Sequence, residues 1–145
     1  MGSGGSQKIF TTVKSYSKRG QLLKRPDLQT LAESRDLDEL VTRIKNTKYI
    51  DAMNSVVKPY TAEKLEMALR ANLADEQFKI AKSSGNSKIL DAFFQKFIIS
   101  NLKLIIKGKI LGKSQEEIST FFNMHAEELA KQRDIVVKAL VAKDL

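Results

Sequence analysis

The residues with the capacity for acid–base or metal chemistry lie near the end of the chain. The only histidine, His125, stands in the segment NMHAEEL, just before Glu127 and Glu128. Histidine can act as a general base, but no Ser or Cys nucleophile motif stands near it in sequence. The two acids are only two and three residues away, which is not the spacing of a helical metal site. We therefore expect no catalytic residue, metal or cofactor here, and a His125 that is exposed or caps a helix.

A second stretch resembles a nucleotide-binding loop only superficially. The segment GKILGKS, Gly108 to Ser114, has the wrong spacing for GxxxxGK[ST], and its first glycine lies inside an expected helix. The neighbouring acids Glu116 and Glu117 belong to SQEE, a capping box in which serine and glutamate each satisfy a free backbone donor. We therefore expect that the chain does not hydrolyse nucleotide itself.

Composition favours one ordinary helical domain with an acidic partner. The chain has 145 residues, 42% of them hydrophobic, and no cysteine, so disulfides and thiolate metal sites are excluded. The net charge of +8 and a pI of about 9.7 indicate an anionic partner: nucleic acid, a membrane surface or an acidic protein face. Tryptophan is absent and aromatic residues are few, so base stacking is poorly supported.

Neither end nor middle of the chain predicts a membrane segment. Residues 1–6, MGSGGS, carry no apolar group to pack, and we interpret them as a flexible leader or cloning remnant. The most apolar stretch, Ile89 to Leu111, contains Asp91 and several lysines. A membrane-spanning helix needs about 20 mainly apolar residues. We therefore interpret this stretch as a soluble core helix.

The whole sequence predicts helices, because it has two prolines, no Asn-Gly or Asp-Gly hairpin signal and no sustained alternation. In the long helix that Thr61 caps, Leu65, Leu69, Leu73 and Phe78 are expected to point inward. The expected fold is an all-α antiparallel array with short connections. Its helices are predicted at Gln7 to Leu23, Pro26 to Glu33, after the N-cap Asp36, Tyr49 to Val57, Thr61 to Gly85, Ile89 to Leu111 after the N-cap Ser87, after Ser114, Ala126 to Gln132 and Asp134 to Ala142.

The central helix, Ile89 to Leu111, carries the most informative pattern. At about 100° per residue, Asn101 and Gly108 fall in the middle of a broad apolar face, and lysines fall on a narrow stripe opposite. We expect the helix to be buried by several neighbours, Asn101 to be a structural polar residue in the core, and Gly108 to permit close helix packing. The lysine stripe is either a solvated face or a partner contact. The candidate contacts are Lys96, Lys103, Lys107, Lys109 and Lys113.

Two segments of equal length indicate a repeat. RPDLQTLAESRDL, Arg25 to Leu37, and RDIVVKALVAKDL, Arg133 to Leu145, both begin with arginine and end in Asp-Leu. We therefore predict one complete repeat at 7–112 and linking helices with the start of a second at 113–145. On this hypothesis the chain is an N-terminal fragment of a longer protein.

Several motifs, taken together, resemble the C-type subunits of the archaeal and bacterial A/V-type rotary ATPases, whose counterpart in the eukaryotic V-type enzyme is the d-type subunit. The resemblance covers most of Phe10 to Leu145. Two positions depart from the family pattern: Ile98 stands where the family often has an acid, and Lys107 where it often has arginine. The motifs are GQLL (Gly20 to Leu23), LAESRDLDELVTRIKNTKY (Leu31 to Tyr49), LEMALRANL (Leu65 to Leu73), NLK (Asn101 to Lys103) and KGKILGKSQEEI (Lys107 to Ile118).

The resemblance implies a specific function. Such proteins are all-helical, consist of three similar repeats arranged as a funnel, and lie on the cytoplasmic face of the membrane as peripheral proteins. They couple the rotor shaft, made of the D and F subunits, to the membrane c-ring during proton or sodium transport and ATP synthesis or hydrolysis. They catalyse nothing and bind no cofactor or small-molecule substrate.

The alternative from the residues alone is a basic helical nucleic-acid-binding protein. The net charge supports it, as does a cluster of basic residues near the N-terminus. Against it, the sequence has no recognition-helix, zinc-finger or glycine-rich loop motif, and acids are interspersed among the bases. The basic cluster consists of Lys14, Lys18, Arg19, Lys24 and Arg25.

Overall fold

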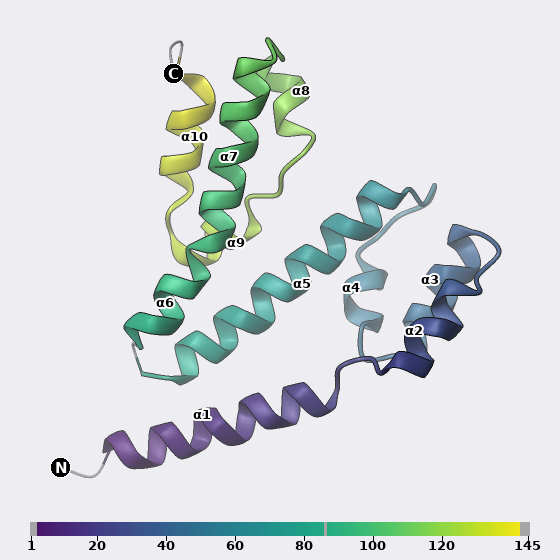
Figure 1. Cartoon of the computed structure of the whole chain (residues 1–145), viewed down its shortest axis with the longest axis vertical. Helices are drawn as coiled ribbons and strands as arrows, with labels where there is room; N and C mark the ends of the chain where they lie inside the picture. Colours follow the sequence, from purple (N-terminus) through teal and green to yellow (C-terminus); the bar gives the residue numbers. More distant parts are fainter. Residues whose placement is uncertain (1–2, 86, 143–145) are drawn as a thin grey trace. The chain divides into compact units, whose positions relative to one another are not determined.

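A computed structural model describes residues 3–85 and 87–142, and these residues form helices and loops without a strand (Figure 1). The all-α class predicted from the sequence is therefore confirmed. The chain divides into two compact units, Met1–Leu73 and Ala74–Leu145, so that the long helix α5 contributes to both. The helices are α1 Ser3–Gly20, α2 Arg25–Ala32, α3 Leu37–Lys45, α4 Ile50–Asn54, α5 Ala62–Ser83, α6 Lys88–Phe94, α7 Lys96–Ile110, α8 Gln115–Ser119, α9 His125–Ala130 and α10 Arg133–Val141.

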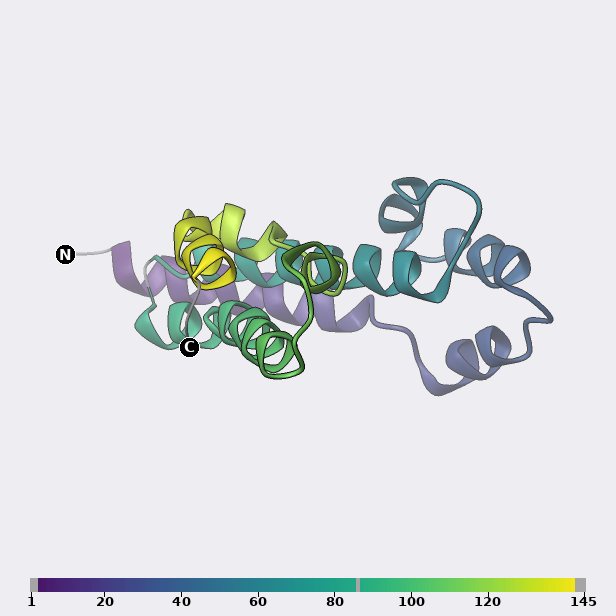
Figure 2. The ribbon, with the colours of Figure 1, turned by 90° about the horizontal axis from the view of Figure 1, so that it is seen from above.

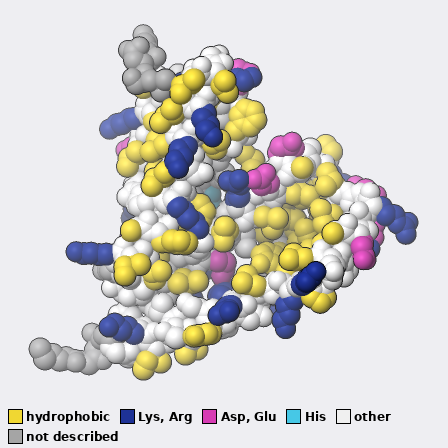
Figure 3. Space-filling view, in the orientation of Figure 1, with side chains coloured by type: hydrophobic (Ala, Val, Ile, Leu, Met, Phe, Trp, Pro, Cys, Tyr) yellow, Lys and Arg dark blue, Asp and Glu magenta, His cyan; other side chains and the backbone are white. Residues whose placement is uncertain are grey.

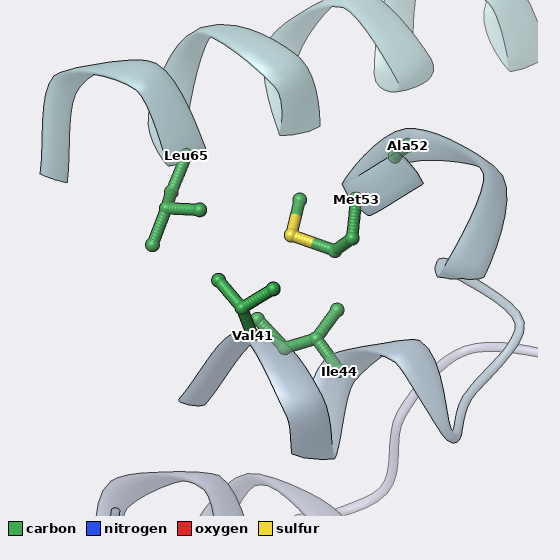
Figure 4. Close-up of a cluster of buried hydrophobic side chains, with 5 residues drawn as sticks. All are labelled: Val41, Ile44, Ala52, Met53 and Leu65. Atoms are coloured by element: carbon green, nitrogen blue, oxygen red, sulfur yellow. The ribbon is translucent and has the colours of Figure 1, made fainter. Parts of the chain in front are cut away.

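The first unit has a small apolar core between α3, α4 and the start of α5. Val41 and Ile44 on α3 meet Met53 on α4 and Leu65 on α5, and Ala52 lies at the edge of the group (Figure 4). Met53 is fully buried. Its unbranched thioether fills the irregular space between three helices, which suits methionine.

Local capping positions α3 in this core. The Asp36 side chain accepts a hydrogen bond from the Glu39 amide at 2.8 Å, as the sequence predicted for an N-cap. Glu39 in turn accepts from the Arg35 amide and pairs with Arg43 one turn later. The amide of Arg35, followed by the guanidinium of Arg43, lowers the pKa of the Glu39 carboxyl below its usual value.

The first helix begins earlier than the sequence predicted. Helix α1 starts at Ser3 instead of Gln7 and ends at Gly20 instead of Leu23. Met1 and Gly2 of the expected leader lie outside the described residues. The apolar side chains of α1 are exposed: Ile9, Phe10, Val13 and Tyr16.

The second unit packs α6 to α10 and the second half of α5 around two apolar clusters. Helix α10 lies against α7, and α8 contacts another side of α7 (Figures 1 and 2). One cluster joins α7, α8 and α10 through Ile98, Ile105, Ile118, Phe122 and Val136. The other joins α5, α6 and α9 through Ala74, Phe94 and Ala126.

The single central helix predicted at Ile89 to Leu111 is wrong. It breaks at Gln95 into α6 and α7. The two apolar clusters meet near this break. Phe94 on α6 packs with Phe78 of α5, and Phe97 at the start of α7 joins them, whereas Ile98 packs among α8 and α10. No proline marks the break in the sequence.

The expected burial of this helix on most sides is also wrong. Ile99, Ile106 and Ile110 on α7 are about half or more exposed, at 49%, 46% and 68%. In the first unit, Leu69 and Leu73 of α5 are likewise exposed rather than inward. They line an open groove of about 470 Å³ with Leu37 and Leu40 of α3. The apolar periodicity of the sequence identified the apolar faces of these helices. It did not show which of those faces are covered by a neighbouring helix.

Among the described residues, no helix is both long and apolar enough to cross a membrane. The compact units divide at Leu73 and Ala74, whereas the segments inferred from the repeat divide after residue 112. The inferred segments concern internal similarity and stay a prediction. The final residues of the second repeat segment, Lys143 to Leu145, lie outside the described residues.

Candidate functional site

A buried amide on α7 connects three segments of the second unit. Asn101 is only 8% exposed. Its Nδ2 donates to the backbone oxygen of Asn123 at 3.0 Å and to Oε1 of Glu127 at 2.7 Å. Both partners are acceptors, so both amide protons are used and the orientation of the amide is fixed. Helix α7 is thereby tied to the α8–α9 loop and to α9.

The sequence did not reveal the partner of this amide, Glu127. This glutamate is completely buried, and its Oε2 has no hydrogen-bond partner among the described residues. Its spacing from His125 excluded a helical metal site, and the sequence predicted no other role for it. The available signal was its place in the first turn of a short helix with apolar neighbours, Ala126 and Leu129. A carboxyl group sealed from solvent can hold an amide in place but cannot reach a substrate.

His125 lies at the beginning of α9 and is paired across the second unit. Its Nε2 is 2.9 Å from Oδ1 of Asp75 on α5, and both side chains are about one-third exposed. Its backbone amide donates to Oδ1 of Asn123 at 2.7 Å. The ring therefore ties α9 to α5. Within the described ranges, no group of three His, Cys, Asp or Glu side chains could hold a metal ion.

Gly108 faces Ile118 of α8 at the opposite end of α7. A Cβ atom built at Gly108 would lie 2.5 Å from Cγ1 of Ile118, far inside van der Waals contact. The glycine is therefore the residue type that the observed approach of α7 and α8 requires. Gly112 follows with φ +66°, the left-handed turn expected at the end of this helix.

The predicted capping box then starts α8. Oγ of Ser114 accepts from the Glu117 amide at 3.1 Å, and Oε2 of Glu117 accepts from the Ser114 amide at 2.9 Å. The Ser114 amide, followed by the Lys113 ammonium, lowers the pKa of the Glu117 carboxyl below its usual value. The capping box fixes the direction in which α8 leaves the turn and presents Ile118 to Gly108.

Two of the five candidate lysines make polar contacts within the second unit. Lys109 donates to the backbone oxygen of Ala142, at the end of α10. Lys113 pairs with Glu117 at 3.0 Å. These contacts give both side chains a role inside the fold, which leaves them less suited to a partner.

The other three lysines lie on one exposed stripe of α7. Lys96, Lys103 and Lys107 recur at intervals of seven and four residues. Lys96 lies over the ring of Phe93, 4.2 Å from its centroid. Neither Lys103 nor Lys107 has an ion pair in the part of the chain that the structure describes. Figure 3 shows lysine and hydrophobic side chains interspersed over the α7 and α10 region.

Comparisons with known proteins identify the family. The model of the ATP synthase (C/AC39) subunit family matches residues 11–144. The C subunit of the A-type ATP synthase of Methanocaldococcus jannaschii is 35% identical over 113 residues, covering 74% of this chain and 28% of that protein. The C subunit of the A-type ATP synthase of Methanothermobacter thermautotrophicus is 27% identical over 110 residues, covering 70% and 28%. No solved structure matches the chain.

The chain thus spans about 28% of the length of these curated relatives. The family match covers nearly all of both compact units, and the alignment with the Methanocaldococcus protein covers most of the chain. The resemblance inferred from the sequence motifs is confirmed by this match. The chain belongs to the ATP synthase C/AC39 subunit family.

Proposed function

We propose that this chain is part of the C subunit of an A-type ATP synthase, a non-catalytic component of the central stalk. In this function it couples the rotor shaft, made of the D and F subunits, to the membrane c-ring during ion transport and ATP synthesis or hydrolysis. The observation that carries the proposal is the family match over residues 11–144. The two relatives named as C subunits of A-type ATP synthases support the same assignment. The place of the protein is then peripheral, on the cytoplasmic face of the membrane.

The packing of the second unit suits a part that transmits torque. A coupling element must move as a stiff body, because compliance between its helices would dissipate the rotation. Asn101 and Glu127 tie α7 to α9, and the close contact of Gly108 with Ile118 holds α8 against α7. Close-packed interiors transmit strain, and fully used hydrogen-bond donors add rigidity. Asn101 as the polar core residue and Gly108 as the close-packing residue belong to this proposal.

The proposal separates coupling from catalysis, and a reconstitution tests both. A rotary complex depleted of the full-length protein that contains this chain is placed in vesicles, and ATP hydrolysis and ion transport are measured together. The full-length protein is then added back. We expect hydrolysis to persist without it and ion transport to return only with it. Hydrolysis that depends on the added protein, or transport that never needed it, would contradict the proposal.

The matched control in this reconstitution is the same full-length protein without the segment that corresponds to this chain. Because this segment contributes both compact units, the shortened protein should fail to restore transport. Restoration by the shortened protein would place the coupling elsewhere and remove this chain from the proposed mechanism.

Nucleic-acid binding stays the second candidate, because the chain is strongly basic. The cluster Lys14 to Arg25 lies on α1, the following turn and the first residue of α2. Binding through phosphate contacts would weaken steeply as the salt concentration increases. In a plot of the logarithm of the binding constant against the logarithm of the salt concentration, the slope is about minus the number of phosphate contacts. A duplex titration at two salt concentrations distinguishes this candidate from the coupling function.

A further inference from the structure

One stretch of the chain is basic without interruption. Between Asp91 and Glu116 there is no acidic residue, while five lysines occur in the same interval. Elsewhere the second unit contains both acids and bases, and exposed ion pairs form, such as that of Arg133 with Glu128. Helix α7 lies entirely inside the acid-free interval. Its exposed side therefore presents positive charge that its own helix does not neutralise.

The same side of α7 also exposes an apolar stripe. At about 100° per residue, Ile99, Ile106 and Ile110 lie next to the lysines 96, 103 and 107, and the two stripes together span an arc of about 100°. The isoleucines are 49%, 46% and 68% exposed, although β-branched apolar side chains of this size are usually buried. Their spacing of seven and four residues is that of one seam of a helix pair. We call this surface the Ile–Lys face.

The rest of α7 is occupied and holds the Ile–Lys face in place. Ile98, Asn101 and Ile105 point into the second unit, where α8, α9 and α10 cover them. The face is thus carried by an anchored helix rather than by a free one. Its backbone donors and acceptors are satisfied within the helix, so only side chains are offered to a partner.

The chemistry of this surface points to one kind of partner. We propose that the Ile–Lys face binds an amphipathic helix whose apolar seam covers the isoleucines and whose adjacent edge is acidic. An acidic edge would pair with Lys103 and Lys107, which have no ion pair among the described residues. Flanking charges of this kind set partner choice in paired helices. This inference does not depend on the proposed coupling function, because it concerns the surface alone.

Other occupants fit the face less well. A second copy would bring lysines against lysines, because the exposed side of α7 contains no acid. Nucleic acid would use the lysines but leave the isoleucine stripe without a role. An interfacial membrane helix inserts a wide apolar face, and the wide apolar face of α7 is packed inside the second unit.

A designed peptide provides the test. The chain has no cysteine, so Ser100→Cys at the edge of the Ile–Lys face takes a single environment-sensitive fluorophore. The probe is a helical peptide of about three heptads with leucines on its seam and glutamates beside them. One control peptide replaces the glutamates by lysines, and another replaces the leucines by serines. We expect the acidic peptide to bind at least about tenfold more tightly than either control, from two or more charge pairs and the apolar seam.

A charge-reversal variant makes the test specific. In Lys103→Glu with Lys107→Glu, both exposed positions become acidic, and we expect the preference to transfer to the lysine peptide. Ile106→Ser should weaken both interactions about tenfold without changing which peptide is preferred. Circular dichroism serves as the control, and we expect each variant to keep its helical signal.

Four results would overturn the proposal. The first is equal binding of the three peptides, and the second is a preference that the charge reversal leaves unchanged. The third is a response from a fluorophore at Ser17→Cys on α1 instead of the one at residue 100, which would place the binding on α1. The fourth is a stronger response at residue 100 to anionic vesicles, duplex DNA or an increased concentration of the chain alone.

Discussion

At the scale of single residues, one amide group organises the second unit. Asn101 uses both of its protons, one for the oxygen of Asn123 and one for the buried carboxyl group of Glu127. It is the only side chain among the described residues that donates to Glu127. Losing it would leave the buried Glu127 oxygen and the partly buried Asn123 oxygen without a donor, which is more costly than losing one exposed hydrogen bond.

Replacing Asn101 by leucine should therefore lower the free energy of unfolding by about 2–3 kcal/mol. Urea denaturation followed by circular dichroism measures this change. Ser100→Ala, on the exposed side of the same helix turn, is the matched control and should change it by less than about 0.5 kcal/mol. Glu127→Gln keeps an acceptor oxygen for Asn101 and should cost less than Glu127→Leu. Equal costs for Asn101→Leu and Ser100→Ala would contradict the structural role of this amide.

For Gly108→Ala, we expect a change in stability opposite to the one that helix propensity alone predicts. Alanine is the better helix former by about 1 kcal/mol, yet its Cβ would overlap Cγ1 of Ile118. Overpacking costs about 1–3 kcal/mol, so Gly108→Ala should be destabilising. In an Ile118→Ala background the overlap disappears, and the same substitution should become neutral or stabilising. Gly20→Ala, with no atom within 4 Å of the new Cβ, is the control and should not destabilise.

Residue types predicted part of this arrangement. An asparagine and a glycine in the middle of an apolar face must have packing or hydrogen-bonding reasons, and the structure places both against neighbouring segments. That Glu127 is the partner of Asn101 could not be inferred, because the two residues are 26 positions apart and a loop lies between them. The pairing of His125 with Asp75 spans 50 residues and was equally inaccessible.

At the scale of helices, most of the predicted capping residues lie at helix ends, whereas burial was predicted poorly. Ser87 occupies the N-cap position of α6 as predicted, but its side chain accepts no capping hydrogen bond. Asp36, Ser114, Gly85 and Gly112 mark helix ends as predicted, because these signals act over three or four residues. The break at Gln95 lies where the packing passes from one apolar cluster to the other, and a local pattern does not show such long-range packing. For the same reason the exposure of apolar residues on α5 and α7 could not be inferred from periodicity.

The capping box of α8 should make stability depend on pH. The pKa of Glu117 is lower in the folded chain than its ordinary value of 4.5. The charged carboxyl group therefore stabilises the folded chain fully at pH values above 4.5. This stabilisation is lost as the pH falls through the lower pKa that Glu117 has in the folded chain. Glutamine at this position does not titrate. The difference in unfolding free energy between the wild type and Glu117→Gln should therefore shrink below pH 4.5.

Urea unfolding at a series of pH values measures this difference. The other carboxyl groups titrate in both proteins, and their contributions cancel in the comparison. A difference that stays constant from neutral to acidic pH would show that the Glu117 contacts do not favour its charged form.

At the scale of the whole molecule, the sequence predicted an all-α protein and the family, and both are confirmed. The order and spacing of the motifs allowed the family to be predicted, because the motifs extend over most of the chain. The internal repeat is a different matter. Three identities in each segment do not determine where a compact unit ends, and the described residues divide at Leu73 and Ala74 inside one continuous helix.

The most direct test of the central claim is a binding titration of this chain against the purified shaft heterodimer of the D and F subunits. It is made at about 150 mM salt, where weak surface attraction is largely screened, with duplex DNA in parallel. We expect saturable binding to the shaft and none to DNA. Saturable binding to DNA without binding to the shaft would contradict the coupling function.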